Sequence, residues 1–350
     1  MKHQLSLIVV MIFLSCNSQE KKTKTSEVTN TIETTKEASQ IGQYVTSAFE
    51  DSKGHLWFGT IDKGMAKYDE KKLKYYTKKD GLPTNRVTGV IEDSKNNYWF
   101  STDKGLLKFD GKNYMRYSIN DDFGSNMISQ LFIDNQGVLW VGTWAGVYIF
   151  NGKDFEYFNI PYPKIETIIN KDTKDWITEI TQDSKGNMWF GRDGYGLCKY
   201  DGEVFTHYLK KDGLHSNNIT AIIFDEDESI WIGTRVSEKD NLDPKKREGK
   251  GGVNKLVNGT IMSFPEIDAF NSNDVYEIYK DRSGAIWIST VRSGVYQYNG
   301  QTFDNYNIPI SIMDMLDDTN GNLWLAGAGG LYRINKQGEI ENITTNGPWN

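Results

Sequence analysis

The chain is poor in cysteine. Among its 350 residues only Cys16 and Cys198 are cysteines. Cys198 aligns with Ala66 and Leu107 in the repeat described below, so we expect a core residue and not a reactive thiol. If Cys16 is removed or modified, Cys198 has no partner in its own chain. An intramolecular disulfide is therefore excluded.

Histidine is also scarce. Beyond the N-terminal segment the chain has only His55, His207 and His215, and none has metal-ligand spacing to another. No nucleophile elbow is present either. We therefore expect no metal, no cofactor and no catalytic residues. Two buried carboxylates close together, or a His-Tyr-Arg cluster, would instead favour an enzyme.

Basic residues are not in excess. The chain has 40 lysines and arginines against 47 aspartates and glutamates, for a formal net charge of −7. Without a basic stripe, nucleic acid is excluded as a partner. The repeated aspartates described below each stand in a four-residue turn with one or two carboxylates, so they do not predict calcium loops.

No apolar run is long enough to cross a bilayer. Lys2 precedes a ten-residue apolar run, Leu5–Leu14, which is typical of a signal peptide. The run ends in Leu-Ser-Cys at 14–16, which resembles the bacterial lipobox and implies lipidation of Cys16. A plain secretory signal that contains a cysteine by chance is the alternative. Three acyl chains would anchor the protein far more firmly than one.

These features predict three parts of the chain. Residues 1–15 are the signal peptide, and residues 16–40 are the lipidated cysteine and a disordered tether, because 17–40 contains no aromatic residue. Residues 41–350 form the folded domain. We expect a monomeric outer-membrane lipoprotein of a Gram-negative bacterium, facing the periplasm or the outside.

Tryptophan, by contrast, is abundant and regularly placed. Seven of the ten tryptophans stand six residues after an aspartate. The pairs are Asp51/Trp57, Asp93/Trp99, Asp134/Trp140, Asp183/Trp189, Asp225/Trp231, Asp281/Trp287 and Asp318/Trp324. Internal repetition at a period near 40 residues is typical of propellers and solenoids.

Each repeat predicts four short strands. An apolar stretch leads into a type I turn with aspartate first and glycine fourth, as in Asp51–Gly54. The tryptophan strand follows, and a glycine then begins a third strand. Asp-Gly or Asn-Gly, for example at 110–111, closes a tight hairpin to the fourth strand. Four antiparallel strands per repeat make a propeller blade.

The repeats favour a closed ring of seven blades. First and third strands lack clean apolar alternation, as expected when both faces of a sheet are covered. No end repeat is a polar cap, which a solenoid would need. We predict an all-β, seven-bladed β-propeller with four strands per blade. A β-helix or tandem sandwiches are the alternatives. Because the repeats run in phase from Val45 to about Ile343, closure should depend on packing between blades 1 and 7.

The repeat resembles the two-component regulator propeller repeat. The shared pattern is D-x-x-G-x-x-W-x-G-T-x-x-G-L/V, preceded by G-L-x-x-N as in Asp80–Asn85 and Asp212–Asn217. The resemblance covers about residues 41–345 and implies the periplasmic sensor part of hybrid histidine kinases in Bacteroidetes, which detects polysaccharide fragments. Those sensors usually carry two propellers and a kinase. Since TTNGPWN alone follows the last repeat here, we do not expect this chain to signal by itself.

One face of the ring is the candidate binding face. Both long insertions, Tyr162–Trp176 and Val236–Gly251, should emerge there, opposite the uniform Asp-turn face. The predicted binding residues on it are Trp144, Trp176, Arg192, Tyr195, His215, Arg235 and Arg292. Three arginines could bind a carboxylate or sulfate, and the aromatic residues could stack on sugar rings. The alternative is that these are solvated loop residues.

Three function classes follow. The first is a membrane-anchored binding propeller for a glycan or a protein partner. The second is a structural or assembly subunit of an envelope complex. The third is a polyanion-degrading lyase or hydrolase.

Overall fold

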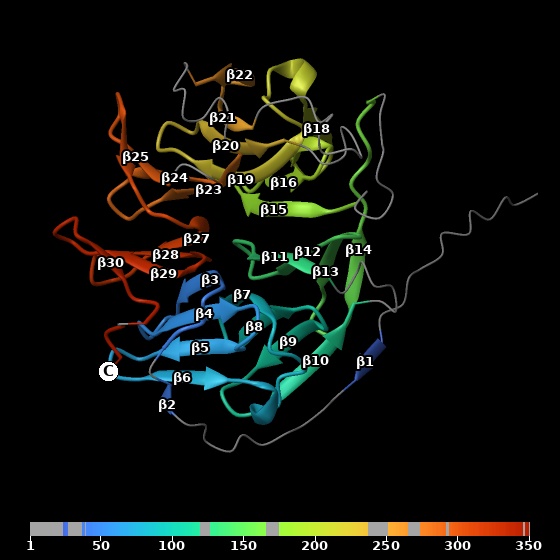
Figure 1. The fold of residues 1–350 in the computed structure, drawn as a ribbon. Coiled ribbons are helices and arrows are strands. Elements are labelled where there is room, and N and C mark those ends of the chain that lie inside the picture. The colour runs from blue at the N-terminus through green and yellow to red at the C-terminus, as the bar shows by residue number, and fades with distance from the viewer. Residues whose placement is uncertain are drawn as a thin grey trace, which may run out of the picture.

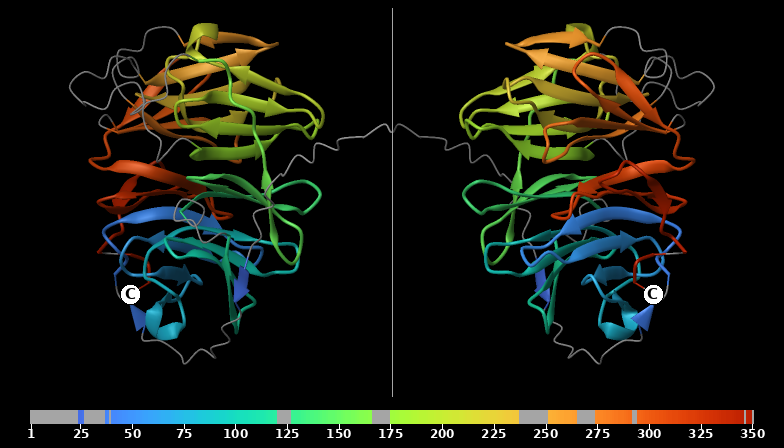
Figure 2. Two further views of the ribbon diagram at one scale, coloured as in Figure 1. Left: turned by 90° about the vertical axis from the view of Figure 1, so that its right-hand side faces the viewer. Right: turned by 90° about the vertical axis from the view of Figure 1, so that its left-hand side faces the viewer.

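The protein is a seven-bladed β-propeller. The computed structural model describes residues 24–26, 37–38, 40–119, 127–165, 175–236, 251–264, 274–291, 294–345 and 347–349. These residues form seven antiparallel sheets around a common axis (Figures 1 and 2). The predicted fold class and blade number are confirmed.

Each blade runs from an inner to an outer strand in chain order. Blade 1 contains β3 (Val45–Glu50), β4 (Leu56–Thr60), β5 (Met65–Tyr68) and β6 (Leu73–Tyr76); blade 2 contains β7 (Val87–Glu92), β8 (Tyr98–Thr102), β9 (Gly105–Phe109) and β10 (Tyr114–Ser118); blade 3 contains β11 (Ile128–Ile133), β12 (Leu139–Thr143), β13 (Gly146–Phe150) and β14 (Phe155–Phe158). Blade 4 contains β15 (Ile177–Gln182), β16 (Met188–Arg192), β17 (Gly196–Tyr200) and β18 (Phe205–Tyr208); blade 5 contains β19 (Asn218–Phe224), β20 (Ile230–Arg235), β21 (Gly252–Val257) and β22 (Thr260–Ser263). Blade 6 contains β23 (Val275–Lys280), β24 (Ile286–Thr290), β25 (Val295–Tyr298) and β26 (Phe303–Tyr306); blade 7 contains β27 (Ser311–Asp317), β28 (Leu323–Ala328), β29 (Gly330–Ile334) and β30 (Ile340–Asn342).

Two short strands extend the outer edges of blades 1 and 2. β1 (Lys24–Ser26) pairs with β10, and β2 (Glu37–Ala38) pairs with β6. Both belong to the segment for which a tether is predicted. The rest of residues 1–39, including Cys16, lies outside the described residues, so the signal peptide, the lipidation and the tether stay predictions. Within the described ranges, no helix has the length and apolar character needed to cross a membrane.

Two short turns carry the G-L-x-x-N element between blades. The 3-10 helices η1 (Lys78–Asp80) and η2 (Lys210–Asp212) each end at a glycine with positive φ. The asparagine side chain of the element then accepts a hydrogen bond from the first N–H of the turn, at 2.9 Å for Asn85 and 2.7 Å for Asn217. The element therefore fixes the connection from one blade to the next.

The invariant spacing of aspartate and tryptophan has a direct cause. In every blade the indole Nε1 donates to the carboxylate of the aspartate six residues earlier. The Nε1–Oδ2 distances are 2.9 Å for Trp57, 3.0 Å for Trp99, 2.8 Å for Trp140, 2.9 Å for Trp189, 3.0 Å for Trp231, 2.7 Å for Trp287 and 2.7 Å for Trp324. All seven side chains are between 0% and 7% exposed, as predicted.

The aspartate also caps its own turn. In blade 1 the Asp51 Oδ1 accepts from the backbone N–H groups of Lys53 and His55, and Gly54 follows with φ +79°. Burial alone would raise the pKa of Asp51, but the hydrogen bonds from Trp57 and the turn lower it to about 2. The carboxylate therefore stays ionised and links the turn to the interblade core.

The seven inner strands surround the central channel. They are β3, β7, β11, β15, β19, β23 and β27, grouped about the centre in Figure 1. Every one of them has a register irregularity after its first apolar residue, for example between Ile177 and Glu179. Such a bulge redirects side chains at the end of a strand. It is a second reason why these strands lack simple alternation.

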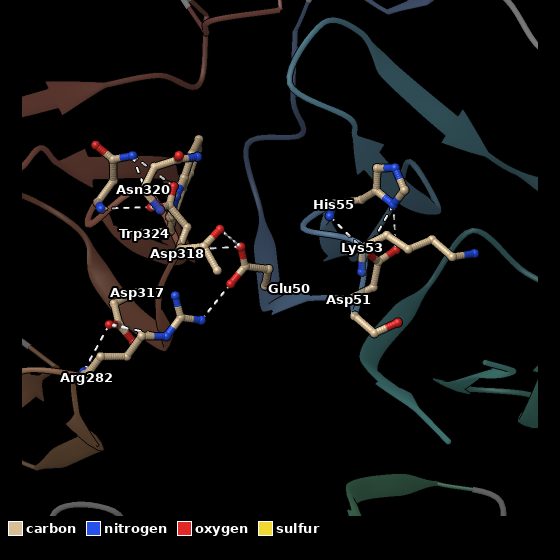
Figure 3. A network of polar contacts seen from close by, with 12 residues as sticks. Glu50, Asp51, Lys53, His55, Arg282, Asp317, Asp318, Asn320 and Trp324 are labelled. Carbon is tan, nitrogen blue, oxygen red and sulfur yellow. Dashed lines mark hydrogen bonds and ion pairs between the residues drawn. The ribbon is translucent and has the colours of Figure 1, made fainter. Parts of the chain in front are cut away.

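Blades 1 and 7 meet through the same kind of link that joins other neighbours. In four blades the residue before the motif aspartate accepts a hydrogen bond from the N–H of the second turn residue of the preceding blade. Glu92 accepts from the Ser52 N–H at 2.7 Å inside the ring. At the seam where the chain closes, Glu50 accepts from the Thr319 N–H at 3.0 Å and pairs with Arg282 at 2.6 Å (Figure 3).

Closure also depends on apolar residues near both chain ends. Ile41 and Trp349, which are 1% and 6% exposed, join the core between blades 1 and 7. The Trp349 ring meets Tyr68 edge-on at 5.6 Å. β3 is the inner strand of blade 1 and β30 is the outer strand of blade 7, so no strand is shared between the ends. The absence of a shared strand agrees with the prediction, but closure depends on more than side-chain packing, because the Gly329 N–H also donates to the Gln43 carbonyl at 2.9 Å and Tyr44 bridges to Ala328.

We expect Glu50→Ala to destabilise the ring by about 1.5–3 kcal/mol, because it removes two hydrogen bonds from Thr319 and the charged contact with Arg282, which then keeps only its pair with Asp317 at 3.8 Å. Glu92→Ala removes only the exposed bonds to Ser52 and should cost about 0.5–1 kcal/mol. Equilibrium urea unfolding measures both. Equal losses in the two variants would show that the seam has no special dependence on Glu50.

Candidate binding site at the mouth of the central channel

A cavity of about 290 Å³ occupies the central channel. Arg235, Trp176 and Tyr276 line its mouth on the face that carries the insertions. Arg235 ends β20 and pairs with Asn218, one residue before the apolar start of the inner strand. The mouth therefore contains a guanidinium and aromatic rings.

Arg235 and Trp176 form the centre of the mouth. The guanidinium carbon lies 5.6 Å from the centroid of the Trp176 ring, a cation–π distance. Among the described residues, Arg235 Nε and Trp176 Nε1 are buried atoms without a hydrogen-bond partner. Buried donors of this kind usually have a partner. Both residues line the cavity.

Trp144 extends the aromatic surface. Its ring lies 5.0 Å from that of Trp176, and the neighbouring Ala145 bridges to Asp175. The two tryptophans come from different connections, one inside blade 3 and one between blades 3 and 4. They are half-buried and present ring area toward solvent. Two of the predicted stacking residues therefore lie together beside Arg235.

Arg192 lies on the other side of the insertion and is buried. Its side chain is 3% exposed, and its guanidinium stands 4.6 Å from the Tyr195 ring and 5.1 Å from the Tyr162 ring. Nη1 donates to the Pro161 carbonyl at 3.1 Å, and Nη2 is 3.9 Å from Asp175. Arg192 thus ties together the two described ends of the insertion Tyr162–Trp176. Residues 166–174 of that insertion lie outside the described residues.

The other predicted site residues occupy varied positions. Tyr195 is 1% exposed beneath Arg192. His215 is held by Asn254, whose Oδ1 lies 2.9 Å from its ring Nδ1. Arg292 lies outside the described residues, as does most of the second insertion, 237–250. The structure therefore brings Arg235, Trp176 and Trp144 together, while Arg192 and Tyr195 support them from within the fold.

Sequence reasoning missed the residues deeper in the channel. Glu179, Glu277 and Asp314 line the cavity below the mouth. Burial raises the pKa of Glu179 to about 8 and the pKa of Asp314 to about 7. Burial also raises the pKa of Glu277, and the nearby carboxyl groups of Glu179 and Asp314 raise it further. Their common position in the aligned repeats was an available signal.

A second polar cluster lies behind Arg192. Both ring nitrogens of His207 are buried without a partner among the described residues, and burial followed by the nearby Arg192 lowers its pKa. His207 faces Cys198 on β17, whose thiol pKa burial raises to about 12. Together with Tyr195, whose ring lies against Arg192, the cluster combines histidine, tyrosine and arginine. However, its nitrogens are inaccessible, so the contacts are those of a buried support.

The turn from the second to the third strand differs between blades. In five blades a threonine hydroxyl donates to the carbonyl of the glycine that begins the third strand. The pairs are Thr60–Gly64 at 2.7 Å, Thr102–Gly105 at 2.6 Å, Thr143–Gly146 at 2.9 Å, Thr234–Gly252 at 3.1 Å and Thr290–Gly294 at 3.3 Å. Blade 4 has Arg192 at this position and blade 7 has Gly327. Arg192 therefore replaces a repeated structural residue.

Comparison with a family model agrees with this division. The model described as "Two component regulator propeller" matches residues 39–62, 81–104, 122–145, 213–235 and 269–292. These segments belong to blades 1, 2, 3, 5 and 6, the five with the threonine. Blades 4 and 7, which lack it, are not matched.

Similar known proteins include a histidine kinase, an extracellular domain of a two component system and a lyase. The chain is 26% identical over 185 residues to a histidine kinase P4 of Formosa agariphila, covering 48% of this chain and 12% of that protein. The extracellular domain described as part of a hybrid two component system of B. thetaiotaomicron is 21% identical with a TM-score of 0.67, covering 89% of this chain and 41% of that one. Virginiamycin B lyase from Staphylococcus aureus is 12% identical with a TM-score of 0.61, covering 87% and 97%.

These likenesses have different extents. At such identities the two structures show the fold alone. The chain spans about an eighth of the length of the histidine kinase and about two fifths of the extracellular domain from B. thetaiotaomicron. The repeat, the family model and the architecture agree with one another. The chain is a seven-bladed propeller in which blades 1, 2, 3, 5 and 6 match the two-component regulator propeller repeat, and its fold is similar to that of extracellular domains of two-component systems from B. thetaiotaomicron.

Proposed function

We propose that the protein is an extracytoplasmic binding propeller, held at the membrane by a lipid on Cys16, that binds an anionic glycan at the channel mouth. The observation that carries the proposal is Arg235, whose buried Nε has no hydrogen-bond partner within the described part of the chain while its guanidinium lies over Trp176. A planar guanidinium recognises carboxylates and sulfates with two hydrogen bonds. Trp144 and Trp176 supply ring faces on which a sugar can stack.

Arg192 has a positioning role in this proposal. It is buried and bound to Pro161 and Asp175, so it orients the end of the insertion from which Trp176 projects. Tyr195 supports Arg192 from below. His215 lies near the base of the second insertion, and Arg292 belongs to the neighbouring blade on the same predicted face. Direct ligand contact is assigned to Arg235, Trp176 and Trp144.

Arg235→Gln should weaken binding of anionic oligosaccharides about 10- to 150-fold, because a hydrogen bond to a charged group contributes about 1.5–3 kcal/mol. Calorimetry with alginate and pectate oligosaccharides, against neutral malto-oligosaccharides, measures the effect. Higher salt should also weaken binding, since charges at a rim are screened over about 8–10 Å.

Arg333→Gln is the matched control. Arg333 also lies over a tryptophan, at 5.5 Å from the Trp324 ring, but on the Asp-turn face and paired with Glu341. Its replacement should leave binding unchanged. Equal affinity of the anionic and neutral probes, or no binding by either, would contradict the proposal and favour an assembly role with a protein partner.

Cys16→Ser should release the protein from the membrane, because three acyl chains hold it in this proposal. Fractionation of cells that express the full chain, combined with mass spectrometry of the N-terminus, measures the change. A mature N-terminus cleaved at another residue and carrying no lipid would contradict the anchoring.

One observation favours a second candidate, a lyase or hydrolase that acts on a polyanion. Glu179 and Asp314 line a cavity and have pKa values raised to about 8 and about 7, close to neutral pH, as general acid–base catalysis requires. Release of new oligosaccharide ends from alginate or pectate, lost in Glu179→Gln and retained in Glu92→Gln, would support it. Unchanged substrate after prolonged incubation would exclude it for these polymers.

A further inference from the structure

The cavity below Arg235 changes from basic to acidic with depth. Glu179, Glu277 and Asp314 stand at one repeat position, directly after the bulge of the inner strand. The same position in the other four blades holds Ser47, Gly89, Gln130 and Ala221. The carboxyl groups are therefore a particular feature of blades 4, 6 and 7 and not of the repeat.

No cation compensates these carboxyl groups among the described residues. Glu179 Oε1 accepts from Gln130 Nε2 at 2.6 Å, and Asp314 accepts from the Ala48 and Met315 N–H groups at 2.8 Å. Neutral donors of this kind solvate a carboxylate only in part. No lysine or arginine of the described chain forms an ion pair with any of the three. The raised pKa values have the same origin, burial without an opposite charge.

Other polar groups of the same cavity also lack partners. Ser47 lines it, is 7% exposed, and has a hydroxyl without a hydrogen-bond partner in the described part of the chain. At the mouth, Trp176 Nε1 and Arg235 Nε are likewise buried and have no hydrogen-bond partner among the described residues. Leaving a buried polar group without a hydrogen bond is unfavourable. The residues that line the cavity thus carry unpartnered donors near its mouth and carboxyl acceptors in its interior.

We infer that the channel binds a zwitterionic ligand end, with its anionic group at Arg235 and a primary ammonium among Glu179, Glu277 and Asp314. This inference rests on the proposed function for the anionic contact at Arg235. A strand rises about 3.3 Å per residue, so the carboxyl groups lie roughly 7–10 Å below the level of Arg235. A cavity of about 290 Å³ accommodates one such end and not a long polymer.

A divalent cation fits the interior less well. The described residues contain no group of three or more histidine, cysteine, aspartate or glutamate side chains that could hold a metal ion. Calcium needs oxygen ligands at 2.3–2.6 Å on several sides. An ammonium with its three donors works with separated acceptors at about 2.7–3.2 Å, and a ligand chain can place it between them.

A series of ω-amino acids can test the spacing directly. The probes are glycine, 4-aminobutyrate, 5-aminopentanoate and 6-aminohexanoate, measured by calorimetry at pH 7 with the whole folded protein. Affinity should be greatest for the five- and six-carbon members. Hexanoate and hexylamine, which each lack one charge, should bind at least 10-fold more weakly. Binding should also release protons, seen as a buffer-dependent heat, because the ammonium favours the ionised carboxylates.

Two variants separate the halves of the site. Glu277→Gln should weaken 6-aminohexanoate at least 5-fold and leave hexanoate unchanged, whereas Arg235→Gln should weaken both. Glu92→Gln, on the Asp-turn face, is the control for removal of one carboxylate. Melting temperatures of all variants show whether the fold is retained.

The outcomes distinguish this inference from the proposed function. If hexanoate binds as tightly as 6-aminohexanoate and Glu277→Gln changes neither, the ammonium site is wrong and the anion contact stands. The same holds if anionic oligosaccharides bind and no amino acid does. If hexylamine binds as tightly as 6-aminohexanoate, the contact at Arg235 fails. If calcium binds, displaces the amino acids and loses affinity in Glu277→Gln, the interior is a metal site and the ammonium site is wrong.

Discussion

Trp189→Ala should lower the free energy of unfolding by about 3–5 kcal/mol. Trp189 is 4% exposed and packs with Leu197 of its own blade and Ile219 and Ile232 of the next, so its loss opens a cavity between blades 4 and 5. The substitution also leaves Asp183 without the indole N–H at 2.9 Å and removes the ring beneath Lys199. Equilibrium urea unfolding measures the loss.

Trp144→Ala is the matched control for this experiment. Trp144 is half-buried on the insertion face, where its ring contacts Trp176 and its backbone N–H donates to the Met127 carbonyl, a bond that alanine keeps. We expect a loss of at most about 1 kcal/mol, since surface substitutions usually have small effects. If Trp189→Ala lowered stability no more than Trp144→Ala, the interblade tryptophan would not be the main support of the ring.

The sequence predicts the position of Trp189 because local chemistry fixes it. Asp183 and Trp189 are six residues apart, and the turn between them brings the carboxylate to the indole N–H. An interaction within seven residues leaves a constant spacing, and seven copies make the spacing visible. The blade number, the tryptophan burial and the closure without a shared strand all follow from this repetition.

The role of Arg192 could not be read in the same way. Arg192 is the last residue of β16, directly before a loop, and its sequence context there is the same as that of an arginine exposed to solvent. Its burial depends on Pro161 and Asp175, which an insertion brings to it from the preceding blade. Only the departure from threonine at this repeat position indicated a particular task.

The channel carboxyl groups escaped prediction for a geometric reason. In a regular strand, Ile177 and Glu179 would point to the same side, and a glutamate there would not be placed in a channel. The bulge between them changes the direction of Glu179. A bulge leaves no reliable mark in one sequence. A comparison of the seven copies at this position does show that three of them are acidic.

These carboxyl groups give the second large effect, an unusual dependence of stability on pH. Glu179 has a pKa of about 8 in the folded protein, above its ordinary value of 4.5 in the unfolded chain, and the pKa of Asp314 is about 7 instead of 3.8. At pH values between the unfolded and the folded pKa of each group, the unfolded state binds fewer protons than the folded state. Stability should therefore fall as pH rises from about 4.5 to about 8 and level off beyond.

The motif aspartates act in the opposite direction at lower pH. The hydrogen bonds of the turn keep the pKa of Asp51 at about 2, and those of Asp93 and Asp183 below their ordinary value. Their contribution is complete above the unfolded pKa of about 4 and is lost as pH falls toward 2. Because stability falls below about pH 4 through the turn aspartates and above about pH 5 through the channel carboxyl groups, the protein should be most stable at about pH 4–5.

Glu179→Gln separates the channel from the turns. A neutral amide keeps the shape of the side chain and removes the group that favours unfolding at high pH. We expect the variant to be more stable than the wild type by about 1–3 kcal/mol at pH 8, and nearly equal to it at pH 4.5. This range lies below the full shift, because the surface of Glu179 is only partly buried and solvent screening weakens the penalty of its charge. Urea unfolding at pH 4.5, 6.5 and 8 measures the slope. Glu92→Gln, which removes one carboxyl group on the Asp-turn face outside the channel, is the control and should not reproduce the gain at pH 8. A Glu179→Gln protein that is less stable than the wild type at pH 8 would mean that the carboxylate is ionised and stabilising inside the channel.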